Sequence, residues 1–176
     1  MALFRRETKS SAFEDTFLPH LDAAHNLARW LTRDPSDADD VVQEAYLRAF
    51  RFFDSFNGGD SRSWILKIVR NTCYTWLQKN RKGDMLTEFD EEVHEVAAPD
   101  QEEILIGNLD RQVLHGLINA LPAEYREVII LRDVQGLSYK EIAVIAEVQL
   151  GTVMSRLARA RKRLQTGWNA KVGGPK

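Results

Sequence analysis

The sequence has a single cysteine and no long apolar run. Cys73 has no partner for an internal disulfide, and no second cysteine or histidine stands near it at metal-ligand spacing. No segment approaches the roughly 18 apolar residues of a membrane-spanning helix, and the opening MALFRRETKSSAFEDTF is too polar for a signal peptide. We therefore expect a protein of a reducing, cytoplasmic compartment that makes no direct membrane insertion and binds no metal ion.

Proline and glycine are also sparse, with 5 prolines and 10 glycines in 176 residues. They stand mostly between stretches with a helical apolar period, and no stretch alternates apolar and polar residues as a strand does. The predicted fold class is therefore all-α. Because domains usually contain roughly 50 to 200 residues, a chain of this length can form two small helical bundles.

Acidic residues are missing from two stretches of the chain. The formal net charge is -2, yet residues 148–176 carry seven lysines or arginines and residues 61–83 carry six, with no acid in either stretch. Residues 84–110 show the opposite pattern, with ten acids and no base. Two separate basic surfaces predict two contacts with a polyanion such as DNA.

The acidic stretch is predicted to join the two bundles as a linker. Asp34 is the expected N-cap of one helix and Pro35 its first residue. The predicted parts are an N-terminal domain (1–83), an acidic linker (84–107) and a C-terminal domain (108–176). The predicted helices lie near 13–31, 35–52, 63–79, 102–120, 122–133, 138–146 and 150–165.

A helix-turn-helix is predicted in the C-terminal bundle, within GLSYKEIAVIAEVQLGTVMSRLARARKRL. Gly136 ends one helix, and Ser138 with Glu141 forms the capping box that begins the next. Small and apolar residues then stand where two helices that cross at a tight turn must touch. These residues are Ile142, Ala143, Ala146, Val148, Val153 and Leu157.

The second helix of this motif carries a polar face beside its apolar stripe. Arginine can bind guanine or phosphate, and serine and threonine can bind phosphate, so this face suits a DNA major groove. A solvated basic helix end, favoured by the helix dipole, would look similar without the preceding helix and capping box. The predicted DNA-binding residues are Thr152, Ser155, Arg156, Arg159 and Arg163.

Two long motifs resemble the extracytoplasmic-function sigma factors, a group of the sigma-70 family. LPAEYREVIILRDVQGLSYKEIAVIAEVQLGTVMSRLARARKRL is similar to their C-terminal domain, which reads the promoter −35 element. DADDVVQEAYLRAFRFFDSF with RSWILKIVRNTCYTWLQKNRK is similar to their N-terminal domain, which binds core RNA polymerase and opens the −10 element. The resemblance implies an alternative sigma factor that is not an enzyme and has no cofactor.

The resemblance also implies sites in the N-terminal domain. One helix face would dock on the clamp helices of the polymerase beta-prime subunit, through Asp40, Gln43, Glu44 and Leu47. A loop would capture a base of the −10 non-template strand, through Asn57, Gly58, Gly59, Asp60, Ser61 and Arg62. The exposed side of the next helix would contact the same strand, through Lys67, Arg70, Asn71 and Tyr74.

Further partners are implied in the same way. These are the polymerase beta flap and an anti-sigma factor, which in the family is often membrane-bound. Trp64 and Trp76 fall near an apolar stripe, so we interpret them as core residues rather than base-stacking ones. Glu147 stands where the family usually has glycine, and Met154 where it often has lysine or arginine. The departure at Glu147 affects the turn of the helix-turn-helix. The departure at Met154 affects which −35 sequence the chain prefers.

Two other classes of protein share parts of this pattern. A stand-alone transcriptional regulator would combine a helix-turn-helix with a helical sensing or dimerisation domain, and it would bind its duplex without polymerase. A protein-binding adaptor with a sigma-like fold would bind an anti-sigma factor without directing transcription. An enzyme is not indicated, because the sequence has no nucleophile-base pair, phosphate-binding loop or metal cluster.

Overall fold

The computed structural model describes residues 2–80 and 105–173, with side chains described for 8–80 and 109–173. Within these residues the chain is helical and forms no β-strand, so the predicted all-α class is confirmed. The N-terminal elements are α1 (Ala2–Phe17), η1 (Leu18–His20), α2 (Leu21–Thr32), α3 (Pro35–Phe52), η2 (Phe53–Ser55) and α4 (Ser61–Asn80). The C-terminal elements are α5 (Leu105–Asn119), α6 (Ala123–Ile129), η3 (Ile130–Val134), α7 (Tyr139–Ala146) and α8 (Leu150–Val172). The linker predicted over 84–107 lies almost entirely outside the described residues, and the last three residues of that range, 105–107, belong to α5.

The N-terminal bundle is built from α2, α3 and α4, which pack against one another. Its core contains Leu27, Leu31, Val42 and Ile65, all with little or no exposed surface. Ala38, Val42, Ala45 and Ala49 of α3 are buried, whereas the Phe52 side chain at the end of the helix is 63% exposed. The apolar period of α3 stops at Phe52, because the helix ends there and the chain enters η2.

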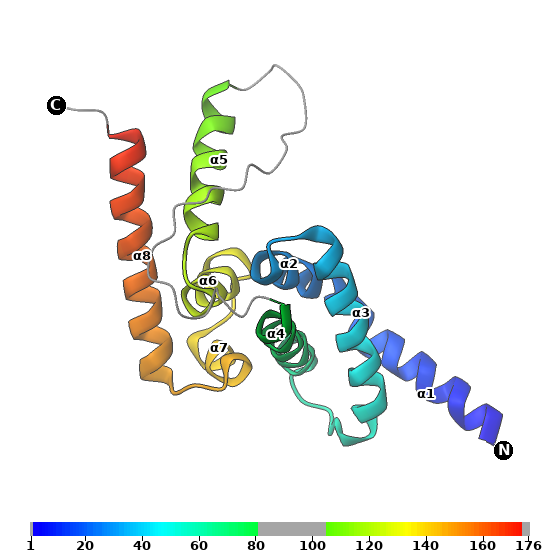
Figure 1. Ribbon diagram of the computed structural model, residues 1–176. Helices are drawn as coiled ribbons and strands as arrows, with labels where there is room; N and C mark the ends of the chain where they lie inside the picture. Colours follow the sequence, from blue (N-terminus) through cyan, green and yellow to red (C-terminus); the bar gives the residue numbers. More distant parts are fainter. Residues whose placement is uncertain (1, 81–104, 174–176) are drawn as a thin grey trace.

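The helix predicted over 13–31 is divided in the structure. The 3₁₀ turn η1 separates α1 from α2, and Pro19 lies inside it. Proline lacks the backbone N–H that would continue the helix, and its ring clashes with the preceding turn. The N-terminal part of α1 extends away from the bundle (Figure 1), while its C-terminal part packs on the bundle through Phe13 and Phe17.

Aromatic rings join α1 to the rest of the N-terminal bundle. Phe17 stacks on Trp64 of α4, with ring centroids 5.0 Å apart, and Phe13 meets Phe53 edge to face at 5.5 Å. Trp76 is partly buried against the same core. Such pairs add about 0.5 to 1.5 kcal/mol beyond the area they bury. The interpretation of Trp64 and Trp76 as core residues is therefore confirmed.

Two predicted helix starts have the expected caps. The Asp34 carboxylate accepts hydrogen bonds from the backbone N–H groups of Ser36 and Asp37 at the start of α3. The Ser138 hydroxyl accepts from the Glu141 N–H, and the Glu141 carboxylate accepts from the Ser138 N–H. These bonds satisfy donors that the first turn of a helix leaves without partners.

The C-terminal bundle packs α5, α6 and α7 against α8. Ile142 and Ile145 of α7 are buried with Val153 and Leu157 of α8, as the helix-turn-helix pattern predicts. Helix α8 runs seven residues past its predicted end and lies beside α5 (Figure 1). Gly167 allows this approach, because a Cβ there would lie 2.5 Å from Leu117 Cδ2.

Two glycines of this bundle differ in backbone conformation and predict opposite effects of the same substitution. Gly136 has φ of +73°, whereas Gly116 lies inside α5, and a Cβ at either position would meet no atom within 4 Å. Gly136→Ala is expected to lower the free energy of unfolding by about 1 to 2 kcal/mol, because L-residues are strained at positive φ. The matched variant Gly116→Ala should raise it by about 0.5 to 1 kcal/mol. Urea denaturation of both variants measures this, and equal shifts would contradict the conformational explanation.

Among the helices of residues 2–80 and 105–173, none combines the length and the apolar character that crossing a bilayer requires.

Candidate functional site

The predicted polymerase-binding residues share the outer side of α3. Asp40, Gln43 and Leu47 are exposed, and the Leu47 side chain is 51% accessible. Glu44 is half-buried and accepts a hydrogen bond of 2.8 Å from Arg48 Nε. This bond from Arg48 lowers the pKa of Glu44, so the carboxylate is charged at neutral pH. The face combines negative charge with one exposed apolar side chain.

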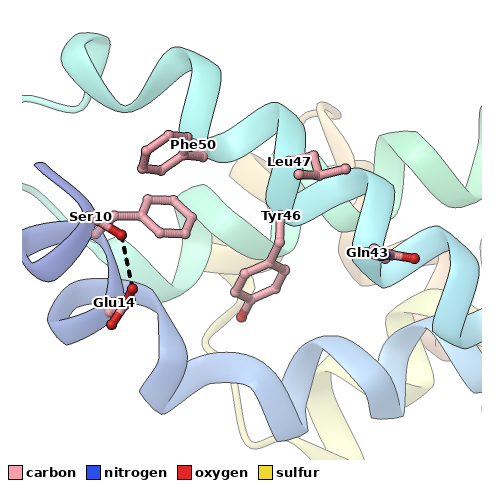
Figure 2. Close-up of a pocket in the computed structure, with 7 residues that line it drawn as sticks. Ser10, Glu14, Gln43, Tyr46, Leu47 and Phe50 are labelled. Atoms are coloured by element: carbon pink, nitrogen blue, oxygen red, sulfur yellow. Dashed lines mark hydrogen bonds between the residues drawn. The ribbon is translucent and has the colours of Figure 1, made fainter. Parts of the chain in front are cut away.

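A shallow groove borders this face, between α1 and α3 (Figure 2). Gln43 and Leu47 line one side of it together with Tyr46 and Phe50. On the other side, the Ser10 hydroxyl donates to the Glu14 carboxylate over 2.9 Å. The contribution of α1 was not predicted, because the helix predicted over 13–31 begins after Ser10.

The predicted base-capture loop has its own internal structure. Asp60 precedes α4 and accepts a hydrogen bond of 3.1 Å from the Ser63 N–H, and its carboxylate also pairs with the Ser63 hydroxyl. Burial would raise the pKa of Asp60, but these hydrogen bonds outweigh it and lower the pKa. Asp60 therefore caps α4, a role that sequence spacing alone did not assign to it. His20 Nε2 lies 2.9 Å from the Ser61 hydroxyl, and this contact joins the end of η1 to the start of α4.

The predicted −10 surface of α4 contacts the C-terminal domain. The Arg70 guanidinium donates to both carboxylate oxygens of Glu127 in α6, over 2.9 and 3.3 Å. Lys67 Nζ lies 3.0 Å from Glu147, and Asn71 donates to the same carboxylate over 3.1 Å. These residues were predicted on an exposed side of the helix, but in the structure they are half-buried. The difference arises because α4 packs against α7.

The buried groups around this contact have shifted protonation equilibria. Glu127 has no exposed surface, and this burial raises the pKa of its carboxyl, although hydrogen bonds from Arg70 oppose the rise. Burial and the nearby Glu127 charge raise the pKa of Tyr74. Burial likewise raises the pKa of Cys73 to about 12, so this thiol is protonated and unreactive at neutral pH.

The predicted −35 residues follow one side of α8, with differing surroundings. Ser155, Arg159 and Arg163 are exposed, and Thr152 is partly exposed. Arg156 instead turns toward α6, where its guanidinium lies 3.3 Å from Glu124 and 3.5 Å from Glu127. Arg159 is thus the better placed of these two arginines to meet a groove.

The two departures from the family pattern have clear structural outcomes. Glu147 ends α7 in the left-handed conformation, with φ of 55° and ψ of 42°, which is the conformation that glycine adopts most easily. The turn is therefore retained without glycine. Met154 is exposed on α8 and supplies an apolar side chain where a cation would extend the basic face.

No cluster of three or more histidine, cysteine, aspartate or glutamate side chains in the described part of the chain could hold a metal ion. His20 and His25 do not form such a cluster. His20 bonds Ser61, and His25 Nδ1 lies 3.2 Å from Asp39. What the described residues offer is two helix faces with basic and polar side chains, on α4 and α8, and one acidic face on α3.

Both halves of the chain match known family models. Residues 16–83 match sigma-70 region 2, and residues 111–164 match sigma-70 region 4. Together these matches cover well over half of the chain, which therefore belongs to the sigma-70 family. Sigma factors are transcription initiation factors rather than enzymes.

Two relatives narrow the family assignment to the ECF group of sigma factors. The ECF sigma-E factor of Escherichia coli K12 is 33% identical over 153 residues, which cover 80% of this chain and 79% of that protein. ECF sigma factor SigE of Mycolicibacterium smegmatis is 31% identical over 157 residues, 88% of this chain, but the match spans only 60% of that longer protein. The chain is an ECF-type RNA polymerase sigma factor.

Solved structures agree with the fold. The sigma factor RpoE of Bartonella quintana, solved with the anti-sigma factor NepR, gives a TM-score of 0.69 at 29% identity, covering 91% of this chain and 98% of that one. CnrH, solved with the cytosolic domain of CnrY, gives a TM-score of 0.67 at 23% identity and supports the fold alone.

Proposed function

We propose that this chain binds core RNA polymerase and directs it to promoters that contain separate −10 and −35 elements. The observation that carries the proposal is the presence of two basic helix faces, on α4 and α8, in two domains of one chain. Each face alone offers only a few contacts. Docking on polymerase brings both to one promoter, and the high effective concentration makes them jointly selective.

Core binding is assigned to the outer face of α3. Its exposed carboxylates and the exposed Leu47 side chain suit a helix-on-helix contact with the beta-prime clamp helices. The groove between α1 and α3 continues this face and adds apolar surface from Phe13 and Phe50. An apolar centre with a polar rim is typical of a specific protein interface.

Recognition of the −10 element is assigned to the loop before α4 and to α4 itself. Small polar residues of the loop (Asn57 to Arg62) would line a pocket for one unstacked base. Lys67 and Arg70 would bind phosphates, while Asn71 and Tyr74 would add selectivity. In this arrangement the exposed strand is trapped, which stabilises the melted promoter.

Recognition of the −35 element is assigned to α8. Its arginines can donate to guanine O6 and N7 in the major groove, and Thr152 and Ser155 can bind phosphate. The C-terminal domain would also contact the polymerase beta flap. The acidic residues of 84–107 would be repelled by duplex DNA and would pass near the polymerase channels instead.

Control by an anti-sigma factor is part of the proposal. The B. quintana relative was solved with such a partner, and it matches this chain over nearly its full length. A protein that covers the α3 face and the C-terminal domain would block core binding. Because core polymerase acts on the chromosome, we place the function in the cytoplasm, with no catalytic residue and no cofactor.

A binding experiment separates this function from that of a stand-alone regulator or an adaptor. The purified chain, with and without core polymerase, is mixed with a library of promoter-length duplexes in a gel-shift assay. The expected result is weak retention by the chain alone and selective retention by the complex. Tight, selective binding without polymerase would favour a regulator, and failure to bind core polymerase would favour an adaptor.

A further inference from the structure

The first two turns of α8 present apolar and hydroxyl side chains to solvent, and Met154 is the longest exposed one among them. In helix-turn-helix proteins, the N-terminal residues of the second helix contact base edges in the major groove. Here α8 begins at Leu150 beside α7 (Figure 1), and Met154 lies about one turn later. We propose that Met154 selects a thymine in the −35 element by contact with the C5 methyl group of that base. This inference rests on the proposed function, since it takes α8 as the helix that reads the −35 element.

Met154 is an apolar side chain that the fold leaves largely in solvent. It is 51% exposed, whereas Val153 and Leu157 of the same helix are buried. Leu164, further along α8, also packs against the hydrophobic core. Met154 therefore contributes little to the packing of the C-terminal bundle. A partner that covers this side chain would remove apolar surface from water, which favours the complex.

Small residues border Met154 on the exposed side of α8. Gly151 stands three residues before it and Ala158 four residues after it, so all three share one side of the helix, and all three are exposed. A Cβ at Gly151 would meet no atom within 4 Å, so the surface there is open. Met154 thus projects from a low surface. The helix can approach base edges closely at this point.

The arginines of α8 leave the surroundings of Met154 to apolar contacts. Arg156 points toward α6, with its guanidinium 3.3 Å from Glu124 and 3.5 Å from Glu127. Arg159 is the first exposed cation of the helix. Because successive residues of an α-helix are about 100° apart, Arg159 lies about 140° around the axis from Met154. The two side chains would therefore meet different base pairs.

Charge indicates which partner covers this side of α8. Residues 148–176 contain seven lysines or arginines and no acid. Such a surface attracts a polyanion, and the cations beyond Met154 can bind phosphates on either side of a groove. Duplex DNA therefore suits the exposed side of α8, and the apolar Met154 side chain is directed at a base edge rather than at a phosphate.

A thymine methyl is the base-edge group that matches a methionine side chain. Of the four bases, only thymine presents a methyl group in the major groove, and the other base edges present hydrogen-bond donors and acceptors alone. Methionine has no hydrogen-bond donor, so it cannot bind guanine O6 and N7. Against guanine or cytosine it would displace water from polar groups without replacing the hydrogen bonds. Its flexible, polarizable side chain can instead pack on a methyl group.

Deoxyuridine tests the methyl contact without any change to the protein, because it pairs with adenine and lacks only the C5 methyl group of thymidine. The −35 element is first defined with core polymerase and the unmodified chain on randomised promoters. Each thymine of the element, on either strand, is then replaced in turn by deoxyuridine. We expect one replacement to weaken promoter binding by the complex about fourfold in a gel-shift assay, the factor given by one methyl-sized group. Equal binding after every replacement, or a −35 element that requires no thymine, would overturn the inference.

Met154→Ala and Val172→Ala separate this contact from a general loss of apolar surface. Val172 is also exposed, at 45%, but it ends α8, about five turns beyond Met154. Both variants change exposed side chains, so the fold should be retained. Met154→Ala should bind the thymine and deoxyuridine promoters equally, whereas Val172→Ala should keep the fourfold difference. A fourfold difference that persists in Met154→Ala would assign the methyl contact to another side chain.

Met154→Arg supplies a change of specificity rather than a loss of binding. Arginine donates to guanine O6 and N7, so this variant should prefer guanine to thymine at the same position by about tenfold. An unchanged preference for thymine would contradict the role of Met154. The proposed function is tested separately by the unmodified chain on unmodified promoters. If its complex with core polymerase retains no promoter selectively, the proposed function fails; if selective retention is insensitive to deoxyuridine, only the inference about Met154 fails.

Discussion

Glu44→Lys is expected to weaken binding of the chain to core RNA polymerase by about tenfold, a loss of roughly 1.4 kcal/mol. Glu44 lies in the middle of the α3 docking face, one turn from the exposed Leu47, and its carboxylate is held by Arg48. Lysine would reverse the charge and repel Arg48. Because Glu44 faces outward, the fold should be retained. Fluorescence anisotropy of the labelled chain titrated with core polymerase measures the dissociation constant.

Asp39→Lys is the matched control for this prediction. Asp39 lies on the same helix, but its carboxylate pairs with His25 of α2 rather than facing the docking surface. We expect core affinity within about twofold of the unmodified chain for Asp39→Lys, since surface substitutions away from a contact have small effects. If both variants lose affinity equally, or if Glu44→Lys binds normally with unchanged helicity, the assignment of the α3 face is wrong.

Arg159→Ala is expected to reduce transcription from promoters with a strong −35 element by about tenfold, because a bidentate arginine-guanine contact contributes roughly 1 to 3 kcal/mol of discrimination. Arg159 is exposed on α8, and no hydrogen bond or ion pair of its side chain is found in the described part of the chain. Its loss should leave the C-terminal bundle intact. Run-off transcription with core polymerase, on templates with and without the −35 element, measures the effect.

Lys171→Ala provides the comparison on the same helix. It removes one positive charge three turns further along α8, away from the helix-turn-helix. Its transcript levels should match those of the unmodified chain on every template. Equal transcript levels for Arg159→Ala, or an equal loss on templates that lack the −35 element, would remove Arg159 from −35 recognition.

The local features of the fold could be predicted from the sequence, because neighbouring residues determine them. The caps at Asp34 and Ser138 each satisfy backbone donors within three residues, so composition and spacing reveal them. The buried stripe of α8 follows from its 3.6-residue period. The break at Pro19 is also local, but the apolar period on both sides of it suggested one continuous helix.

The contacts between domains could not be predicted in this way. Arg70 and Glu127 are 57 residues apart, and Lys67 and Glu147 are 80 apart, so no periodic pattern links them. The sequence therefore showed α4 as a free polar face, although the fold covers it. The groove between α1 and α3 was not predicted for a related reason, since it depends on how these two helices lie beside each other in the fold.

Run-off transcription from a library of randomised promoters, using core polymerase and this purified chain, shows whether the two DNA-binding faces direct initiation together. We expect discrete transcripts whose templates share two separated sequence elements, one read by α4 and its preceding loop and the other by α8. Arg159→Ala should then select templates that share only the downstream element. If core polymerase with the unmodified chain produced no transcripts beyond those of core polymerase alone, the chain would not direct initiation through these two faces.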